Sequence, residues 1–241
     1  MKEHSIFYGF LSVPYPSFCI NCGKRTDNPY PLCDLCMADI KEIEPPYCNI
    51  CGKPLPSGVN FNICGSCISS RPPFKMARSG YIYRDVLKNV IHEWKYAKKR
   101  SFSKFVDIFL EKALLKSDLP VYNIDMISFV PISKSKLKNR GFNQVEDISK
   151  YISIKFNIPL FKGIRKKEGF QDQTLLSRND RLRNVKGAFY LSEALPKYVK
   201  NLLIIDDVYT TGATVSEISS LIFSHRKDIN IYIFTFSRGV Q

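Results

Sequence analysis

Cysteine is absent from most of this chain, because all eight cysteines among its 241 residues lie between positions 19 and 67. The sequence also lacks any run of about 18 apolar residues, the length that a membrane-spanning helix needs. The longest apolar stretch near the N-terminus, residues 6–13, follows Glu3 and stops at Pro14, which is a poor signal peptide. No Gly-Lys-Ser or Gly-Lys-Thr occurs, which excludes an NTPase P-loop. We therefore expect a cytoplasmic protein with no membrane span.

Acidic residues are outnumbered, and the imbalance falls on one part of the chain. The formal net charge is +14, whereas residues 1–70 carry −1, so residues 71–241 carry +15. Such an excess favours a polyanionic partner, although a basic proteome or simple solubility would also produce it. The stretch 69–73 contains two prolines that stiffen an extended segment. We place a domain boundary there, giving domains 1–70 and 71–241.

The cysteines form four Cys-x-x-Cys pairs, and the first and third belong to a repeated block. Residues 19–24 read Cys-Ile-Asn-Cys-Gly-Lys, and residues 48–53 read Cys-Asn-Ile-Cys-Gly-Lys. Thiolates at this spacing hold a tetrahedral metal, so we predict a double zinc ribbon with two structural zinc ions. A cytosolic location disfavours disulfides, and redox chemistry would need only one dithiol. Pairing in sequence order, with a cross-braced arrangement as the alternative, gives two ligand sets: Cys19, Cys22, Cys33 and Cys36, then Cys48, Cys51, Cys64 and Cys67.

The most informative stretch is residues 202–214. Branched apolar residues 202–205 predict a strand buried on both faces, and Asp206 and Asp207 close it. A helix N-terminus and hydroxyl groups after the strand favour a bound dianion, and the acidic pair suits the vicinal hydroxyls of a sugar, directly or through Mg²⁺. The alternative is a buried strand that ends in a polar turn. We predict a ribose-phosphate cradle whose turn contains Thr210, Thr211, Gly212, Ala213 and Thr214.

This order of residues resembles the ribose-phosphate motif of type I phosphoribosyltransferases, which bind 5-phosphoribosyl-1-pyrophosphate (PRPP). The resemblance implies that the turn holds the 5-phosphate and that the acidic pair faces the ribose hydroxyls. It also implies the fold class: an α/β domain with a type I phosphoribosyltransferase-like parallel sheet and a helical cap, preceded by the small double zinc ribbon.

Other segments fit that architecture. Residues 126–130 predict a strand whose carboxyl end leads to Ser133 and Lys134, where open α/β sheets bind ligands; with backbone amides these residues suit a pyrophosphate. Helical spacing predicts a helix over 86–94, which places His92 on its solvated side, and another helix from 103; together they would cap the cradle. Residues 160–164 predict a short strand, 188–191 and 231–236 predict outer strands, and the polar, basic connection 165–187 is typical of a lid.

The whole set of motifs is similar to the ComF (ComFC) family. It comprises the double ribbon, Arg-Gly-Phe-Asn-Gln at 140–144, Gln173 with Arg-Leu-Arg-Asn-Val at 181–185, and the cradle. The resemblance implies a competence protein that handles single-stranded DNA entering the cytosol during natural transformation. It further implies binding of PRPP and a protein partner from the DNA-uptake machinery, of the helicase type.

Two main functional hypotheses follow. In the first, which we favour, the basic domain binds single-stranded DNA and retains PRPP, while the ribbons dock a protein partner; Trp94, Tyr96 and Phe170 are candidates for stacking on bases, with core packing as the alternative for Trp94. In the second, a Mg²⁺-dependent enzyme transfers ribose 5-phosphate from PRPP to an unidentified nitrogen acceptor, with Asp206, Asp207 and Lys134 as catalytic residues. The candidate nucleic-acid contacts are Lys95, Lys98, Lys99, Arg100, Arg140, Arg165, Lys166, Lys167 and Arg181.

Overall fold

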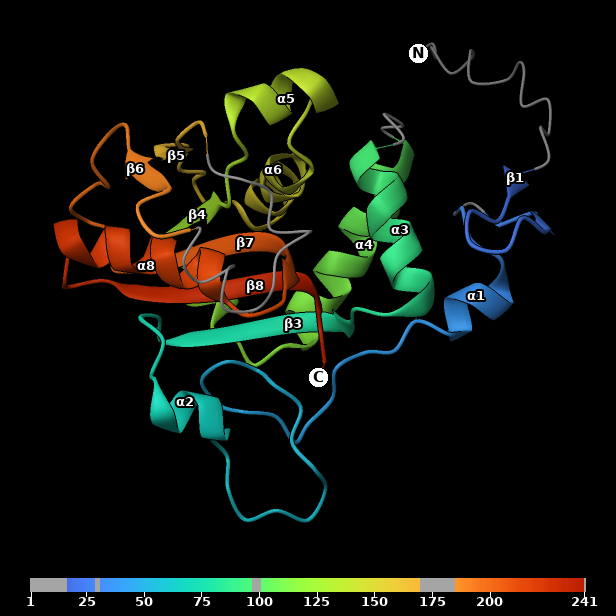
Figure 1. Ribbon diagram of the computed structural model, residues 1–241, viewed down its shortest axis with the longest axis horizontal. Helices are drawn as coiled ribbons and strands as arrows, with labels where there is room; N and C mark the ends of the chain where they lie inside the picture. Colours follow the sequence, from blue (N-terminus) through green and yellow to red (C-terminus); the bar gives the residue numbers. More distant parts are fainter. Residues whose placement is uncertain (1–16, 29–30, 97–100, 170–184, 241) are drawn as a thin grey trace, which may run out of the picture.

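The computed structural model describes residues 17–28, 31–96, 101–169 and 185–240. Its centre is a four-stranded, fully parallel sheet (Figure 1). The central segments of the two middle strands, residues 202–205 and 231–234, are apolar or aromatic because both of their faces are covered. In spatial order the strands are β3 (Met76–Ile82), β8 (Asn230–Arg238), β7 (Asn201–Tyr209) and β4 (Met126–Phe129). The parallel α/β sheet predicted from the sequence is confirmed.

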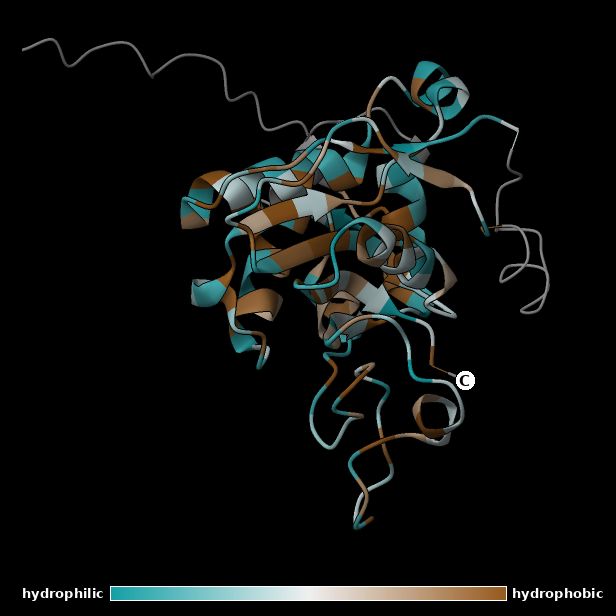
Figure 2. Ribbon diagram, turned by 90° about the vertical axis from the view of Figure 1, so that its left-hand side faces the viewer, coloured by the Kyte–Doolittle hydropathy of each residue, from teal (hydrophilic) through white to brown (hydrophobic). Residues whose placement is uncertain are grey.

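Alternate residues of the sheet pack into two separate cores. Leu203 and Ile205 pack with α3 (Asp85–Tyr96), α4 (Ser101–Lys116) and α6 (Gln144–Phe156). Leu202 and Ile204 pack with the opposite core, which contains α8 (Ala213–His225). This follows from the two-residue period of a strand, which sends successive side chains to opposite faces. Figure 2 shows the apolar residues concentrated in the central strands.

The N-terminal ribbons lie at different places around this sheet. The first lies beside α3, and the second lies beyond the edge strand β3 (Figure 1). Short elements make up the ribbons and the remaining connections: β1 (Ser17–Phe18), β2 (Arg25–Thr26), α1 (Asp34–Ala38), α2 (Gly65–Ser69), the 3-10 helix η1 (Val121–Asn123), α5 (Lys134–Arg140), β5 (Ile164–Lys166) and β6 (Phe189–Leu191).

Three strand predictions need correction. The segment 188–191 contains β6, which pairs antiparallel with β5 in a separate two-stranded sheet and is not part of the main one. The segment 231–236 lies next to the central strand as expected, but β8 is an inner strand with β3 outside it. The strand expected over 160–164 is β5 instead, and Leu160 forms only an isolated bridge with Ile127.

The helices follow the sequence more closely. The helix over 86–94 is α3, and His92 is exposed on it as expected. Helix α4 packs against the sheet. Of the two helices predicted to cap the cradle, α3 is the one that contributes to it, through Lys95 near its C-terminal end. Helix α5 was not predicted, because its sequence is short and has no apolar period. Within the described residues, no helix is long and apolar enough to cross a membrane.

Candidate zinc sites and phosphate cradle

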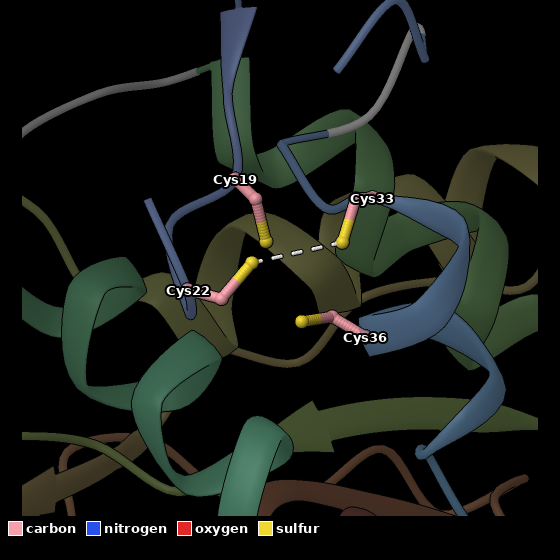
Figure 3. Close-up of side chains that lie close together, drawn as sticks. All are labelled: Cys19, Cys22, Cys33 and Cys36. Atoms are coloured by element: carbon pink, nitrogen blue, oxygen red, sulfur yellow. Dashed lines mark hydrogen bonds between the residues drawn. The ribbon is translucent and has the colours of Figure 1, made fainter. Parts of the chain in front are cut away.

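The eight cysteine sulfurs form two groups in sequence order. The sulfur atoms of each set of four lie within 4.8 Å of one another. Figure 3 shows the first group, in which the Cys22 and Cys33 sulfurs are 3.7 Å apart. The Cys51 and Cys64 sulfurs of the second group are also 3.7 Å apart. A tetrahedral zinc with bonds of about 2.3 Å requires sulfur separations of about 3.8 Å. Each group therefore fits one zinc ion, and the alternative cross-braced pairing is wrong.

The surroundings of some sulfurs suit thiolates, whereas burial raises the pKa of Cys36 to about 12 and also raises the pKa values of Cys51 and Cys67. All eight cysteines are free of disulfide bonds. The amide of Cys64 donates to the Cys48 sulfur at 3.3 Å, and the side chain of Asn21 donates to the Cys36 sulfur at 3.3 Å. Burial alone would raise the pKa of Cys48, but backbone hydrogen bonds outweigh it and lower the pKa to about 7. Donors that stabilise the negative sulfur favour metal binding, because the thiolate is the form that ligates.

The predicted cradle lies at the carboxyl end of β7. The strand runs past Asp206 and Asp207 to Tyr209, which is farther than expected. Gly212 then caps α8 with a φ of 77°, a left-handed conformation that glycine adopts without strain. The Thr211 hydroxyl accepts a hydrogen bond from the amide of Ala213 at 3.3 Å. Strand, acidic pair, turn and helix N-terminus thus follow one another as the sequence predicts.

The two carboxylates are in different electrostatic states. The Lys95 ammonium is 2.6 Å from a carboxylate oxygen of Asp207. Burial would raise the pKa of Asp207, but Lys95 outweighs this and lowers it. Burial, together with the Asp207 charge, raises the pKa of Asp206 to about 8. At neutral pH the pair therefore holds mainly one negative charge, on Asp207, and that charge is balanced by Lys95.

Two further cations and one amide complete this site. Arg140, which is buried, helps Lys95 to lower the pKa of Asp207, and Lys166 opposes a small part of the rise in the pKa of Asp206. Sequence reasoning assigned Lys95, Arg140 and Lys166 to DNA, but the structure gathers them around the acidic pair. Gln144, which sequence reasoning did not include among the site residues, donates to Asp207 at 3.5 Å. The sequence signal for Gln144 was its position directly before a series of apolar residues with helical spacing.

The loop at Ser133 and Lys134, which was predicted to bind pyrophosphate, binds the side-chain carboxylate of Glu168. Ser133 caps α5, and its hydroxyl accepts from the amide of Lys136 at 3.3 Å. Glu168 accepts from the amide of Lys134 at 2.6 Å and from the hydroxyl of Ser135 at 2.9 Å. The hydrogen bond from Ser135 lowers the pKa of Glu168. The contact joins the segment after β5 to the start of α5, so the amides expected to bind pyrophosphate here bind Glu168.

The other candidates divide into exposed, buried and undescribed residues. Arg165 and Lys167 are exposed at β5, as is Lys134 on α5. Trp94 is 2% exposed and packs edge-on against Phe236, so the core-packing alternative holds for it and base stacking does not. For the remaining candidates, the whole residue or its side chain lies outside the part of the chain that the structure describes. They are Lys98, Lys99, Arg100, Phe170, Gln173, Arg181 and the side chain of Tyr96.

Fold and site together define a class: an α/β protein with a parallel sheet, a carboxylate-and-turn cradle, and two N-terminal groups of four cysteines. The family described as the double zinc ribbon domain matches residues 10–68. Competence protein F of Haemophilus influenzae is 30% identical over 212 residues, covering 85% of this chain and 90% of that protein. This chain belongs to the competence protein F (ComF/ComFC) family.

Other relatives agree with that assignment. Competence protein ComFC of Bacillus subtilis is 23% identical over 86% of this chain and 84% of its own length. DNA utilization protein YhgH of Escherichia coli K12 is 27% identical over 79% of this chain and 83% of its own. Among solved structures, a Helicobacter pylori xanthine-guanine-hypoxanthine phosphoribosyltransferase aligns with 12% identity over 59% of this chain and 86% of its own, at a TM-score of 0.37. A score this low supports no argument about function.

Proposed function

We propose that this protein handles single-stranded DNA in the cytosol during natural transformation, and that its cradle binds PRPP with Mg²⁺. The names of the curated relatives, two competence proteins and a DNA utilization protein, support the biological role. The net charge of +15 on residues 71–241 supports a polyanionic partner. The motif at 206–214 and its surroundings support PRPP.

One observation supports the ligand most strongly: buried polar groups converge on the acidic pair and one of them has no protein partner. Gln144 is 2% exposed, and its Oε1 atom accepts no hydrogen bond from any described residue. A buried acceptor without a donor is costly, so it indicates a group that is supplied on binding. Ribose hydroxyls or the waters of a hydrated Mg²⁺ are such donors. Lys95, Arg140 and Lys166 provide positive charge for the phosphates.

Calorimetry with PRPP and Mg²⁺ tests the cradle, and Asp206→Asn is the variant of choice. The pKa of Asp206 is about 8, so the folded protein already holds this carboxyl mostly neutral at pH 7 and the amide should fold normally. Replacing Asp207 instead would leave Lys95 buried beside a neutral amide. We expect Asp206→Asn to weaken PRPP binding about 10-fold or more, because the Mg²⁺ that binds with PRPP favours the ionised carboxylate of Asp206 and an amide cannot supply that charge.

The matched control is Asp228→Asn, a surface carboxylate paired with Lys200 after α8. It should leave PRPP affinity unchanged. Wild-type protein that fails to bind PRPP, or an Asp206→Asn variant with full affinity and an unchanged melting temperature, would contradict the assignment of the cradle.

For DNA we propose the exposed basic surface where α5 meets β5. Glu168 holds these two segments together, and Figure 1 shows them side by side. The surface is defined by four exposed cationic residues: Lys134, Lys138, Arg165 and Lys167. Long, exposed cationic side chains suit phosphate contacts with little base preference.

Fluorescence anisotropy with a labelled single strand, at several salt concentrations, tests this surface. If the protein contacts about five phosphates, log affinity should fall against log salt with a slope of about −3.5. Arg165→Glu with Lys167→Glu should flatten the slope by about 1.4, because each lost contact removes about 0.7. Lys197→Glu is the control, since Lys197 is exposed before the opposite end of β7. A flattening about half as large in the control, which reverses one charge instead of two, would favour net charge over this surface.

Transfer of ribose phosphate is a separate question from binding. The cradle provides groups for the ribose and for phosphate charge, and pyrophosphate release from PRPP, measured with free bases and with DNA, separates the two hypotheses. Release that depends on an acceptor would establish the enzyme. Binding without release would leave PRPP as a ligand of a DNA-handling protein.

A further inference from the structure

Two buried arginines extend from the main sheet into the second ribbon. Arg78 on β3 is 3% exposed, and Arg238 at the end of β8 is 5% exposed. Arg238 donates from Nη1 to the carbonyl of Cys51, and its Nη2 atom is 3.7 Å from the Cys51 sulfur. A guanidinium beside a zinc-ligating sulfur is an outer-shell partner, which neutralises the charge of a tetrathiolate centre and orients its ligand.

The other side of the Arg238 side chain faces the cradle. Its Cζ atom is 4.2 Å from the centroid of the Tyr209 ring. Tyr209 is 7% exposed, and its ring lies against Gly212 so closely that a Cβ on Gly212 would be 2.2 Å from the tyrosine oxygen. Gly212 is the residue that caps α8 in the proposed phosphate turn. The Tyr209 ring therefore packs against this turn.

These contacts make one continuous path from a zinc ligand to the phosphate turn: Cys51, Arg238, Tyr209, Gly212. The path is sensitive to the state of the metal site because Arg238 has few other hydrogen-bond partners. Its Nε atom has no hydrogen-bond partner among the described residues. If the Cys51 sulfur moved, the buried guanidinium of Arg238 would lose another partner. Because an unpaired buried charge is costly, the guanidinium would then tend to move away from the Tyr209 ring.

We propose that Arg238 is a positioning residue that couples zinc at the second four-cysteine group to the conformation of the phosphate turn. Zinc bound by Cys48, Cys51, Cys64 and Cys67 holds Arg238 over Tyr209, and Tyr209 then holds Gly212 where α8 begins. Where the ligand is PRPP this inference rests on the proposed function, but the coupling between metal site and turn does not. Coupling is reciprocal, so a ligand that orders the turn must also slow the loss of this zinc.

Arg78 provides an internal control. It donates to the carbonyls of Cys48 at 3.4 Å and Asn49 at 3.2 Å, so it also holds the second ribbon. Its other contacts are with the carbonyl of Ala77, the carboxylate of Asp118 and the ring of Tyr47, and none of them belongs to the cradle. A variant of Arg78 therefore loosens the ribbon without touching the path to Gly212.

Hydrogen exchange of the full-length, zinc-loaded protein tests the path without any ligand. We expect Arg238→Lys to speed exchange of the amides at 210–215 by about 5-fold or more, the lower range for coupled sites, relative to any change at the amides of 202–205 in the centre of the sheet. Arg78→Lys should leave those amides unchanged. Tyr209→Phe, which removes the oxygen nearest Gly212, should speed exchange at the same amides. Unchanged exchange in Arg238→Lys, or an equal increase in Arg78→Lys, would overturn the proposal.

Zinc release to a chromophoric chelator, with and without Mg²⁺ and PRPP, tests reciprocity. PRPP should slow release from the second site of the wild type about 5-fold or more, and less in Arg238→Lys. If PRPP binds but leaves zinc release unchanged, the coupling is wrong although the cradle stands. If PRPP does not bind and Arg238→Lys still loosens residues 210–215, the proposed ligand is wrong and the coupling is supported.

Discussion

The two zinc ribbons start from nearly the same six residues and occupy different environments. Gly23 and Gly52 follow the two equivalent Cys-x-x-Cys pairs, and both have a φ of 70°. A Cβ on Gly23 would meet nothing within 4 Å, whereas a Cβ on Gly52 would be 2.7 Å from the carbonyl oxygen of Ala77. Local sequence thus determines the turn in both copies, and the surrounding protein decides how tightly each turn is packed.

The burial of the ligands shows the same difference. All four cysteines of the second group are buried, whereas Cys22 of the first is exposed and Cys33 is half-buried. The second ribbon also completes the main sheet at its edge, because the amide of Ala77 donates to the carbonyl of Ile50 at 2.7 Å. Cys19, Leu32 and Cys36 of the first ribbon are buried in the core that contains α3, whereas the second ribbon contacts the edge strand of the sheet. We infer that the first zinc stabilises its ribbon and the contact with α3, and that the second stabilises the edge of the sheet.

The largest expected effect comes from matched cysteine pairs. Cys51→Ser with Cys64→Ser should lower the free energy of unfolding by more than about 4 kcal/mol, because metal loss also uncovers the sheet edge. Cys22→Ser with Cys33→Ser should change the stability of the sheet by less than about 1 kcal/mol. Urea unfolding followed by the fluorescence of Trp94 measures this, since the only tryptophan is buried in the sheet core. Equal losses in the two variants would remove the distinction between the ribbons.

A smaller effect should separate Gly52→Ala from Gly23→Ala. Both variants place a side chain at positive φ, which costs about 1 kcal/mol. Gly52→Ala also forces a methyl group against the backbone of β3, and overpacking of this kind costs about 1–3 kcal/mol more. The two free energies of unfolding, measured in the zinc-loaded protein, give the difference directly. A difference near zero would mean that the second ribbon is not held against β3.

The sequence was sufficient for features that are set locally. The repeated Cys-x-x-Cys pairs predicted both metal groups, and the apolar run before Asp206 predicted the central strand. Helix α3 followed from its apolar face. In each case the signal is a spacing within about 20 residues, so it does not depend on knowing which elements become neighbours.

Features that depend on distant neighbours could not be read in this way. Strand β3 contains Arg78, Ser79 and Gly80, which are atypical of a strand, and its edge is covered by residue 50 of the second ribbon and by residues 41–43. Lys95 and Arg140 looked like solvent-facing DNA contacts because a sequence does not show that they meet Asp207. The domain boundary at residue 70 stays a prediction, although Cys48 and Ala77 share one core across it.

The smallest effect concerns how the first ribbon is attached to α3. The Asn89 side chain donates to Asn21 at 2.8 Å, and Asn21 in turn donates to the Cys36 sulfur at 3.3 Å. Asn89→Ala removes a hydrogen bond of about 1 kcal/mol that orients this outer-shell donor, so zinc should leave the first site about 5-fold faster. Release from the second site should not change, because no described contact joins it to Asn89.

Lys88→Ala is the matched control, since Lys88 is exposed on the same helix. Release to a chromophoric chelator should show two phases, with the fast phase from the more exposed first site. Asn89→Ala should accelerate only the fast phase, and Lys88→Ala should accelerate neither. Acceleration of the slow phase by Asn89→Ala would show that the two ribbons communicate through α3 and the sheet, and the contrast between a first ribbon attached to α3 and a second one attached to the sheet edge would then be lost.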